Sequence, residues 1–275
     1  MSGETSKPGL MYLAEFIGTA ALVFIGLSIV ILINGTGSLV PKWIPSPDTR
    51  RLITGFLFGC TGASIAISWV GKHSGAHINP VVSIAFWLAR RLRGSDLFGY
   101  LTAQMAGAVA GALPLLLWGS MGKSMLFGAT IPDPHAGIGI ALLGEIVTTF
   151  VMVVLLFCFL GHKRLMPFTP LLFPPLYSLM VWLEAPLSGT STNTARSFGP
   201  SVISGAWEGW WIYWIGPVAG MLIGLACYHS PFMRSVDVRI AKLYHFHCDP
   251  HGRLKQKAKP GYPCHGPVLE ASTSE

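Results

Sequence analysis

A short polar motif occurs twice in this chain, and each copy lies between long apolar segments. The first copy, Ser74 to Val81, reads SGAHINPV, and the second, Ser188 to Ala195, reads SGTSTNTA. In each copy an asparagine, Asn79 or Asn193, precedes a short stretch that can form a helix. Asparagine is a favoured N-cap residue. A polar loop repeated within an apolar chain predicts two half-helices that meet near the middle of a membrane, where a solute would pass.

The composition predicts an all-α integral membrane protein. Of the 275 residues, 51% are hydrophobic and 11% are charged, against about 25% charged in a soluble domain. The mean hydropathy is +0.54. The net charge of +7 could indicate a nucleic-acid partner in a soluble protein, but here the basic residues lie in loops and the tail. We therefore expect the lipid bilayer, and no nucleic acid, as the partner.

Six apolar runs are long enough to cross about 30 Å of hydrocarbon. They lie at residues 10–33, 52–71, 97–118, 137–160, 168–187 and 207–228. The stretches after Asn79 and Asn193 are too short to span and suit re-entrant half-helices. We expect a cytoplasmic N-terminus at 1–9, a channel domain at 10–230 and a basic tail at 231–275. Both termini are expected to be cytoplasmic, because most Lys and Arg then face inward, and the plasma membrane is the expected location.

The repeat extends beyond the two loops. Glu15 lies in the first span and Glu145 in the fourth, each followed after three residues by Gly18-Thr19 or Thr148-Thr149. Ala106-Gly107 in the third span recurs as Ala219-Gly220 in the sixth. Three spans in each half reverse the direction of the second half, so the fold class is six membrane helices and two half-helices in an inverted 3+3 repeat.

Over residues 10–230 these motifs resemble the aquaporin family, also called major intrinsic proteins. The resemblance rests on the doubled Asn loop, on Ala195-Arg196-Ser197 after the second copy and on the paired Glu residues. It implies a passive channel for water, with small uncharged solutes such as glycerol as further candidates. Ions and protons would be excluded. It also implies a homotetramer, no cofactor and no enzymatic activity.

The two asparagines are expected at the pore midplane, with their amide NH2 groups free to donate to a passing oxygen atom. The positive ends of the two half-helices would oppose cations there. Thr194 stands where the family usually has Pro. Pro at the first helical position pre-sets φ, so Thr194 predicts a looser second loop.

The resemblance also implies an outer selectivity filter. Arg196 matches its arginine, Thr190 matches a loop position that contributes a backbone carbonyl, and Val181 stands where water-selective members usually have His. An ungapped count assigns the last position to Gly59, whereas the Phe58-Gly59 pair favours Phe58. Val181 predicts a wider constriction, while Ser197 and Tyr213-Trp214 resemble the water-channel pattern.

Three acidic residues and one histidine remain to be interpreted. In the family, residues like Glu15 and Glu145 accept hydrogen bonds from the loop backbone, and His77 is expected to support its loop. A proton relay through the two Glu is the alternative. Glu184 lies one turn beyond Val181, which suggests that it faces the outer vestibule near Arg196. A solvated Glu at the end of the fifth span is the other interpretation.

The tail contains residue types that bind zinc or copper, namely His245, His247, Cys248 and His251. Their spacing matches no standard zinc module, so this is a weak metal-site candidate. Two functions other than a water channel are also compatible with the sequence. One is an aquaglyceroporin-like channel for glycerol, urea or metalloid acids, and the other is an ion-coupled transporter, which should carry more charges at membrane depth.

Overall fold

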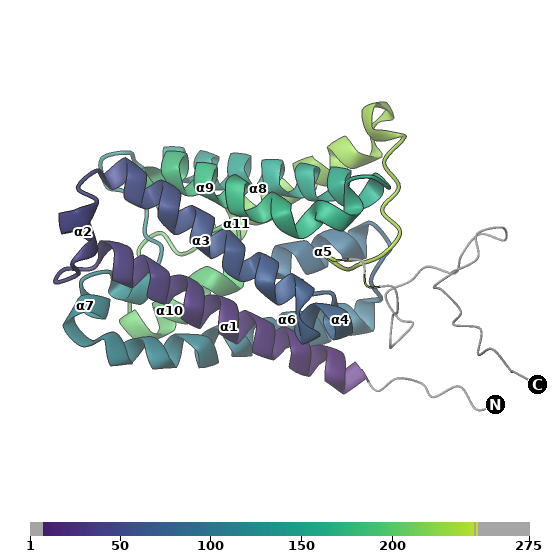
Figure 1. Ribbon diagram of the computed structural model, residues 1–275. Helices are drawn as coiled ribbons and strands as arrows, with labels where there is room; N and C mark the ends of the chain where they lie inside the picture. Colours follow the sequence, from purple (N-terminus) through teal and green to yellow (C-terminus); the bar gives the residue numbers. More distant parts are fainter. Residues whose placement is uncertain (1–7, 245, 247–275) are drawn as a thin grey trace, which may run out of the picture.

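The structure is a computed structural model that describes residues 8–244 and 246. It is an all-helical bundle (Figure 1). Its six long helices are α1 (Pro8–Asn34), α3 (Pro47–Ile67), α6 (Gly94–Ala112), α8 (Ile138–Gly161), α9 (Thr169–Ser188) and α11 (Ile212–His229). The shorter helices are α2 (Val40–Trp43), α4 (Trp69–Ser74), α5 (Pro80–Leu88), α7 (Gly119–Lys123) and α10 (Thr194–Ser204). The fold class expected from the sequence is confirmed.

Five segments of the described chain are long and apolar enough to cross a membrane. They are Pro8–Asn34, Gly94–Lys123, Ile138–Gly161, Met166–Ser188 and Ile212–His229. The sixth long helix, α3, has 21 residues but begins with Asp48, Arg50 and Arg51, which lower its hydropathy. Large apolar side chains on the outer faces are exposed, Leu117 by 89% and Leu171 by 65%. In a membrane these side chains would contact lipid.

Several helix boundaries differ from the sequence-based expectation, and two of them have an identifiable local cause. The second span was expected to run to residue 71, but α3 ends at Ile67 because Ser68 adopts an extended conformation. The Ser68 side chain then accepts a hydrogen bond from Val70 N and caps the short helix α4. The sixth span was expected from residue 207, but α11 begins at Ile212 after a turn. Local capping and turns, rather than hydropathy, set these ends.

The two short helices after the motifs enter the bundle from opposite ends. In Figure 1, α5 lies toward the end that holds α4 and the start of α1, and α10 lies toward the end that holds α2 and α7. The last described residues lie at the same end as the start of α1. The two half-helices thus have the arrangement expected of an inverted repeat.

Small residues allow the long helices to approach closely. A Cβ atom on Gly107 of α6 would lie 2.4 Å from the Phe16 carbonyl oxygen of α1, and one on Gly220 of α11 would lie 2.3 Å from the Ile146 carbonyl oxygen of α8. Gly107 and Gly220 are equivalent in the two copies of the repeat. The contacts α1–α6 and α8–α11 are therefore the same helix pair built twice.

Candidate functional site

The two motif loops have the same backbone conformation. Gly75 and Gly189 end the preceding helices with left-handed φ values of 88° and 83°. Two further residues in each loop also have positive φ, Ala76 and Ile78 in the first and Thr190 and Thr192 in the second. Non-glycine residues hold such values only when surrounding contacts over-determine them. The two copies therefore share a conformation although five of their eight residues differ.

A buried carboxylate supplies those contacts in each half. Glu15 accepts hydrogen bonds from the backbone N–H groups of His77 and Ile78 at 2.9 and 2.7 Å. Glu145 accepts the equivalent bonds from Ser191 and Thr192 at 2.7 and 2.9 Å. Both carboxylates are fully buried. Each carboxylate thus pairs two loop N–H groups that would otherwise be buried without a partner.

The two asparagines cap the half-helices and also join the two loops. The Asn79 side-chain oxygen accepts a hydrogen bond from Val81 N, and that of Asn193 accepts from Ala195 N. Asn79 Nδ2 donates to the Thr192 carbonyl and Asn193 Nδ2 donates to the Ile78 carbonyl, each at 2.9 Å. The amides are therefore not wholly free. Each has two N–H groups, so one remains to donate to a passing molecule.

A tyrosine from the neighbouring long helix ties down each loop. Tyr100 OH of α6 donates to the Ser74 carbonyl at 2.6 Å, and Tyr213 OH of α11 donates to the Ser188 carbonyl at 2.7 Å. Thr194 Oγ1 also donates to the Tyr213 carbonyl at 3.2 Å. This bond attaches the first residue of α10 to α11, so the hydroxyl of Thr194 replaces part of the constraint that Pro80 provides in the first loop.

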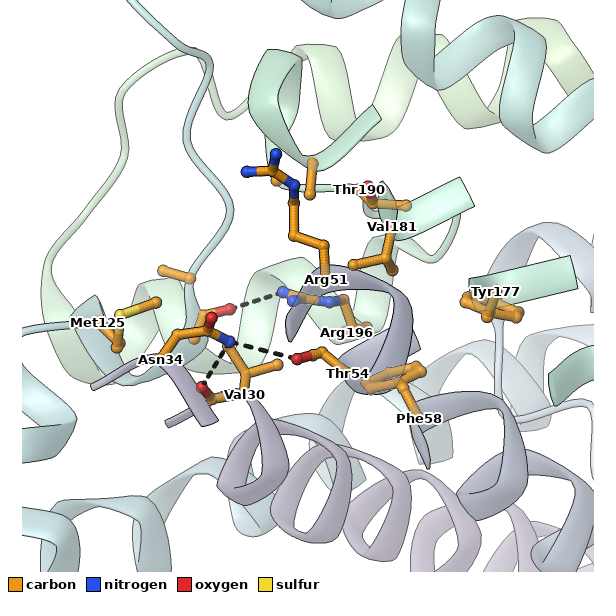
Figure 2. A pocket seen from close by; sticks show the side chains of 14 residues that line it. Val30, Asn34, Arg51, Thr54, Phe58, Met125, Tyr177, Val181, Thr190 and Arg196 are labelled. Atoms are coloured by element: carbon orange, nitrogen blue, oxygen red, sulfur yellow. Dashed lines mark hydrogen bonds between the residues drawn. The ribbon is translucent and has the colours of Figure 1, made fainter. Parts of the chain in front are cut away.

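An outer pocket of about 240 Å³ lies on the side of the loops nearest α2. Figure 2 shows Arg196 pointing into it beside Phe58, with Val181 and Thr190 on the opposite wall. The Arg196 guanidinium donates to the Gly128 carbonyl at 2.7 Å and lies 6.0 Å from the centre of the Phe58 ring. Four of the predicted filter positions therefore meet in one pocket.

The structure distinguishes the two alternatives for the α3 position. Phe58 lines the outer pocket, whereas Gly59 does not. A Cβ atom on Gly59 would lie 2.5 Å from the Phe173 carbonyl oxygen of α9. Gly59 is therefore needed where α3 and α9 touch, and Phe58 is the residue that faces Arg196.

The hypothesis that Glu184 faces the outer vestibule is wrong, and so is the alternative of a solvated side chain. Glu184 is 3% exposed and does not line the pocket. It packs against Gly144 of α8, and Ser188 Oγ lies within hydrogen-bond distance of both Glu184 and Glu145, 2.6 Å from the latter. Because a hydroxyl has one hydrogen, Ser188 donates to one of the two carboxylates at a time. The pocket-facing residues of α9 are Val181 and Ala185, and Glu184 lies about 100° from Ala185 around the helix.

A smaller inner pocket of about 40 Å³ lies on the other side of the loops and is lined by Asn79, Asn193 and His77. Residues 238–244, which we call the carboxyl-terminal segment, fold against it. Leu243 lines the pocket, and its N–H donates to the Gly75 carbonyl at 3.0 Å. His77 Nε2 lies 3.0 Å from the Ala241 carbonyl and Nδ1 lies 3.0 Å from Ser83 Oγ. His77 therefore contacts its own loop and this segment.

The proposed metal ligands of the tail, His245, His247, Cys248 and His251, lie outside the described residues. Within the described part of the chain, no group of three or more His, Cys, Asp or Glu side chains could hold a metal ion.

Sequence reasoning missed several residues of the site. Gln104 donates to Glu15 at 2.7 Å and to Ser83 at 2.9 Å. Asn34 and Arg51 line the outer pocket. Tyr177 lines both pockets. Gln104 could have been noticed as a polar residue within an apolar span, whereas Tyr177 gives no such signal because tyrosine is common in membrane helices.

The bundle has helices long enough to span a membrane and two capped half-helices with a pocket on either side of their loops. This arrangement is that of a channel rather than an enzyme. The family model described as Major intrinsic protein matches residues 5–228. The chain belongs to this family. It is an integral, multi-pass membrane protein that forms a passive channel for water or small solutes.

Two relatives and one solved structure agree with this assignment. The chain is 34% identical over 232 residues to Aquaporin-4 of Rattus norvegicus, an alignment that covers 82% of this chain and 68% of that protein. It is 30% identical over 235 residues to Aquaporin-6 of Mus musculus, covering 84% of this chain and 75% of the relative. The fold is similar to that of the aquaglyceroporin from Plasmodium falciparum, with a TM-score of 0.66 at 19% identity, covering 84% of this chain and 99% of the other.

Proposed function

We propose that the chain conducts water and excludes ions and protons. The observation that carries this proposal is the exchange of hydrogen bonds between Asn79 and the Thr192 carbonyl and between Asn193 and the Ile78 carbonyl. This exchange fixes both amides in the wall of the inner pocket, with one N–H on each left to bind a water oxygen. The N-termini of α5 and α10 point their partial positive charges at the same place.

Arg196 supports ion exclusion at the outer end. Its side chain is 6% exposed and has no carboxylate partner within ion-pair distance among the described residues. An unneutralised positive charge beside a narrow path opposes cations. Phe58, Val181 and Thr190 would complete the filter around it. Glu15 and Glu145 then act as supports for the loops rather than as a proton relay, because loop N–H groups occupy both oxygen atoms of each.

A second candidate is a channel that conducts mainly glycerol, urea or metalloid acids. The small side chain of Val181 favours it, because an imidazole at that position would occupy more of the outer pocket. Similarity to an aquaglyceroporin adds only a shared fold, so it does not favour either solute.

We also propose a homotetramer in the plasma membrane with both termini in the cytoplasm. The support is membership of the family and the position of both described chain ends at one end of the bundle (Figure 1). Chemical crosslinking of the protein in membranes tests the oligomer, and protease accessibility of the two termini tests the orientation.

Stopped-flow light scattering on proteoliposomes tests the function. Vesicles that contain the purified chain should shrink faster in a hyperosmotic buffer than vesicles of the same lipid without protein. A matched preparation of Asn79→Leu with Asn193→Leu should lose that difference. Shrinkage at the protein-free rate by the wild-type chain would refute a water channel.

A further inference from the structure

We propose that Tyr177 is the size-selecting residue of this channel, one helical turn deeper than the expected filter position Val181. This inference rests on the proposed water-channel function. Tyr177 and Phe58 are the two residues that line both the outer and the inner pocket. The two pockets therefore meet at this pair of rings, and a solute that passes from one to the other must pass them.

The positions on α9 support a continuous path. Phe173 and Tyr177 line the inner pocket, and Tyr177, Val181 and Ala185 line the outer one. These residues are four apart, so they form one stripe along the helix. Tyr177 is the largest side chain of the stripe. The small Val181 leaves the outer pocket wide, and the Tyr177 ring narrows the path about 6 Å further in.

The Tyr177 ring is held from several sides. Its centre lies 5.7 Å from that of Phe58 on α3 and 6.3 Å from that of Phe173 on its own helix. Both separations are typical of aromatic contacts. The Tyr177 hydroxyl lies 2.9 Å from Thr192 Oγ1 in the second loop and 3.5 Å from Met152 Sδ of α8. A ring fixed by groups from three elements is a defined constriction and not a freely rotating side chain.

The Tyr177 hydroxyl is also part of a polar contact with the second loop. Thr192 Oγ1 lies 2.9 Å from the Tyr177 hydroxyl and 2.7 Å from the Ser191 carbonyl, and either hydroxyl can be the donor in the contact between them. The Tyr177 oxygen has lone pairs that can accept from water. The carbonyl of the same Thr192 receives the Asn79 amide, so the constriction is linked directly to the asparagine pair.

The test compares water and glycerol fluxes of the full chain in proteoliposomes. Tyr177→Val removes the ring and should raise glycerol permeability roughly tenfold, the change that about 1.4 kcal/mol of barrier produces. Tyr177→Phe keeps the ring and should leave glycerol excluded. Leu179→Val on the same helix changes a side chain that is 52% exposed on the outer face, so it is the matched control and should behave as wild type.

Failure of the inference and failure of the function appear in different arms. Wild-type vesicles that take up water no faster than empty ones would refute the function, and the inference with it. Wild-type water flux with no gain of glycerol flux in Tyr177→Val would overturn the inference alone, as would free passage of glycerol in the wild type. If Tyr177→Val aggregates on size-exclusion chromatography, Tyr177→Trp replaces it. That larger ring should reduce water flux, and an unchanged flux would overturn the proposal.

Discussion

The first and second motif loops have the same backbone and the same anchors but different surroundings. Each has a glutamate that binds two N–H groups, an asparagine cap and a tyrosine that holds the helix end. The first loop also has Gln104 bound to Glu15, and the carboxyl-terminal segment covers it on the side of the inner pocket. The second loop has Glu184 in place of an amide and faces the larger outer pocket.

This difference separates two kinds of residue. The contacts that occur in both halves position the loops, because each pairs a buried backbone group. Other residues without an equivalent in the opposite half line the outer pocket, among them Arg196 and Val181. Arg196 of the second loop corresponds to Val82 of the first when the two asparagines are aligned. We infer that selectivity arises from the residues that break the repeat.

The largest expected effect comes from making the second loop like the first at this position. Arg196→Val removes a charge whose interaction with a passing cation is about 4 kcal/mol at 4 Å in a partly screened site. Proton or cation leakage into proteoliposomes should rise by up to the order of a thousandfold. A pH-sensitive dye inside the vesicles measures it. Arg51→Val, at the same pocket but with Asp48 as its ion-pair partner, is the control and should leak much less.

The next largest effect is expected when the carboxyl-terminal segment packs less tightly against the first loop. Leu243 is 4% exposed and lines the inner pocket. Leu243→Ala should weaken the packing of the carboxyl-terminal segment by about 2–5 kcal/mol and open the inner pocket, so water permeability should exceed that of the wild type. Leu179→Ala, on the outer face, should not change it. Equal permeability of the wild type and Leu243→Ala would show that the segment does not limit flow.

A smaller effect tests the contacts that the halves share. In Glu15→Gln and Glu145→Gln a side-chain NH2 replaces one acceptor oxygen and leaves at least one buried N–H unpaired. The cost should be about 1–3 kcal/mol for each, seen as a lower Tm in detergent. Glu184→Gln is the matched control, because its amide can donate to Ser188 Oγ and leave that hydroxyl to Glu145. If the Glu184 variant lost as much stability as Glu145→Gln, the two roles assigned here would be wrong.

The smallest effect is expected when Thr194 is replaced by the proline that the first loop has at the equivalent position. Thr194→Pro should gain about 0.4–1 kcal/mol because the unfolded chain loses freedom, and should lose about 1 kcal/mol with the hydrogen bond to the Tyr213 carbonyl. The Tm and water flux should stay close to the wild type. Thr194→Val, which loses the bond without the gain, should be the less stable of the two. A large stabilisation by proline would mean that the hydroxyl contributes little.

The sequence was sufficient for the architecture and for the residues that the repeat duplicates. Asn79 could be recognised together with Asn193, and Glu15 together with Glu145, because the two residues of each pair occupy equivalent positions in the two halves of the repeat. The repeat could not assign residues that depend on which helices touch. Phe58 and Gly59 differ by one position, and the choice depends on the close contact of α3 with Phe173 and Pro174 of α9.

Glu184 and Tyr177 are two further residues whose roles depend on tertiary contacts and not on the repeat. A spacing of three residues from Val181 suggested a shared face for Glu184, but the space beside Gly144 accepts its side chain instead. Tyr177 is an ordinary residue in the sequence and becomes informative only through its contacts with Phe58, Met152 and Thr192. The boundary of α3 likewise depends on the extended backbone of Ser68.

The most direct test of selective water conduction measures water and proton flux in the same wild-type proteoliposomes. Light scattering reports water, and an enclosed pH-sensitive dye reports protons. A water channel that excludes protons should give water permeability above that of protein-free vesicles together with a proton leak equal to theirs. Water flux at the protein-free rate, or a proton leak that rises with the amount of protein, would contradict it.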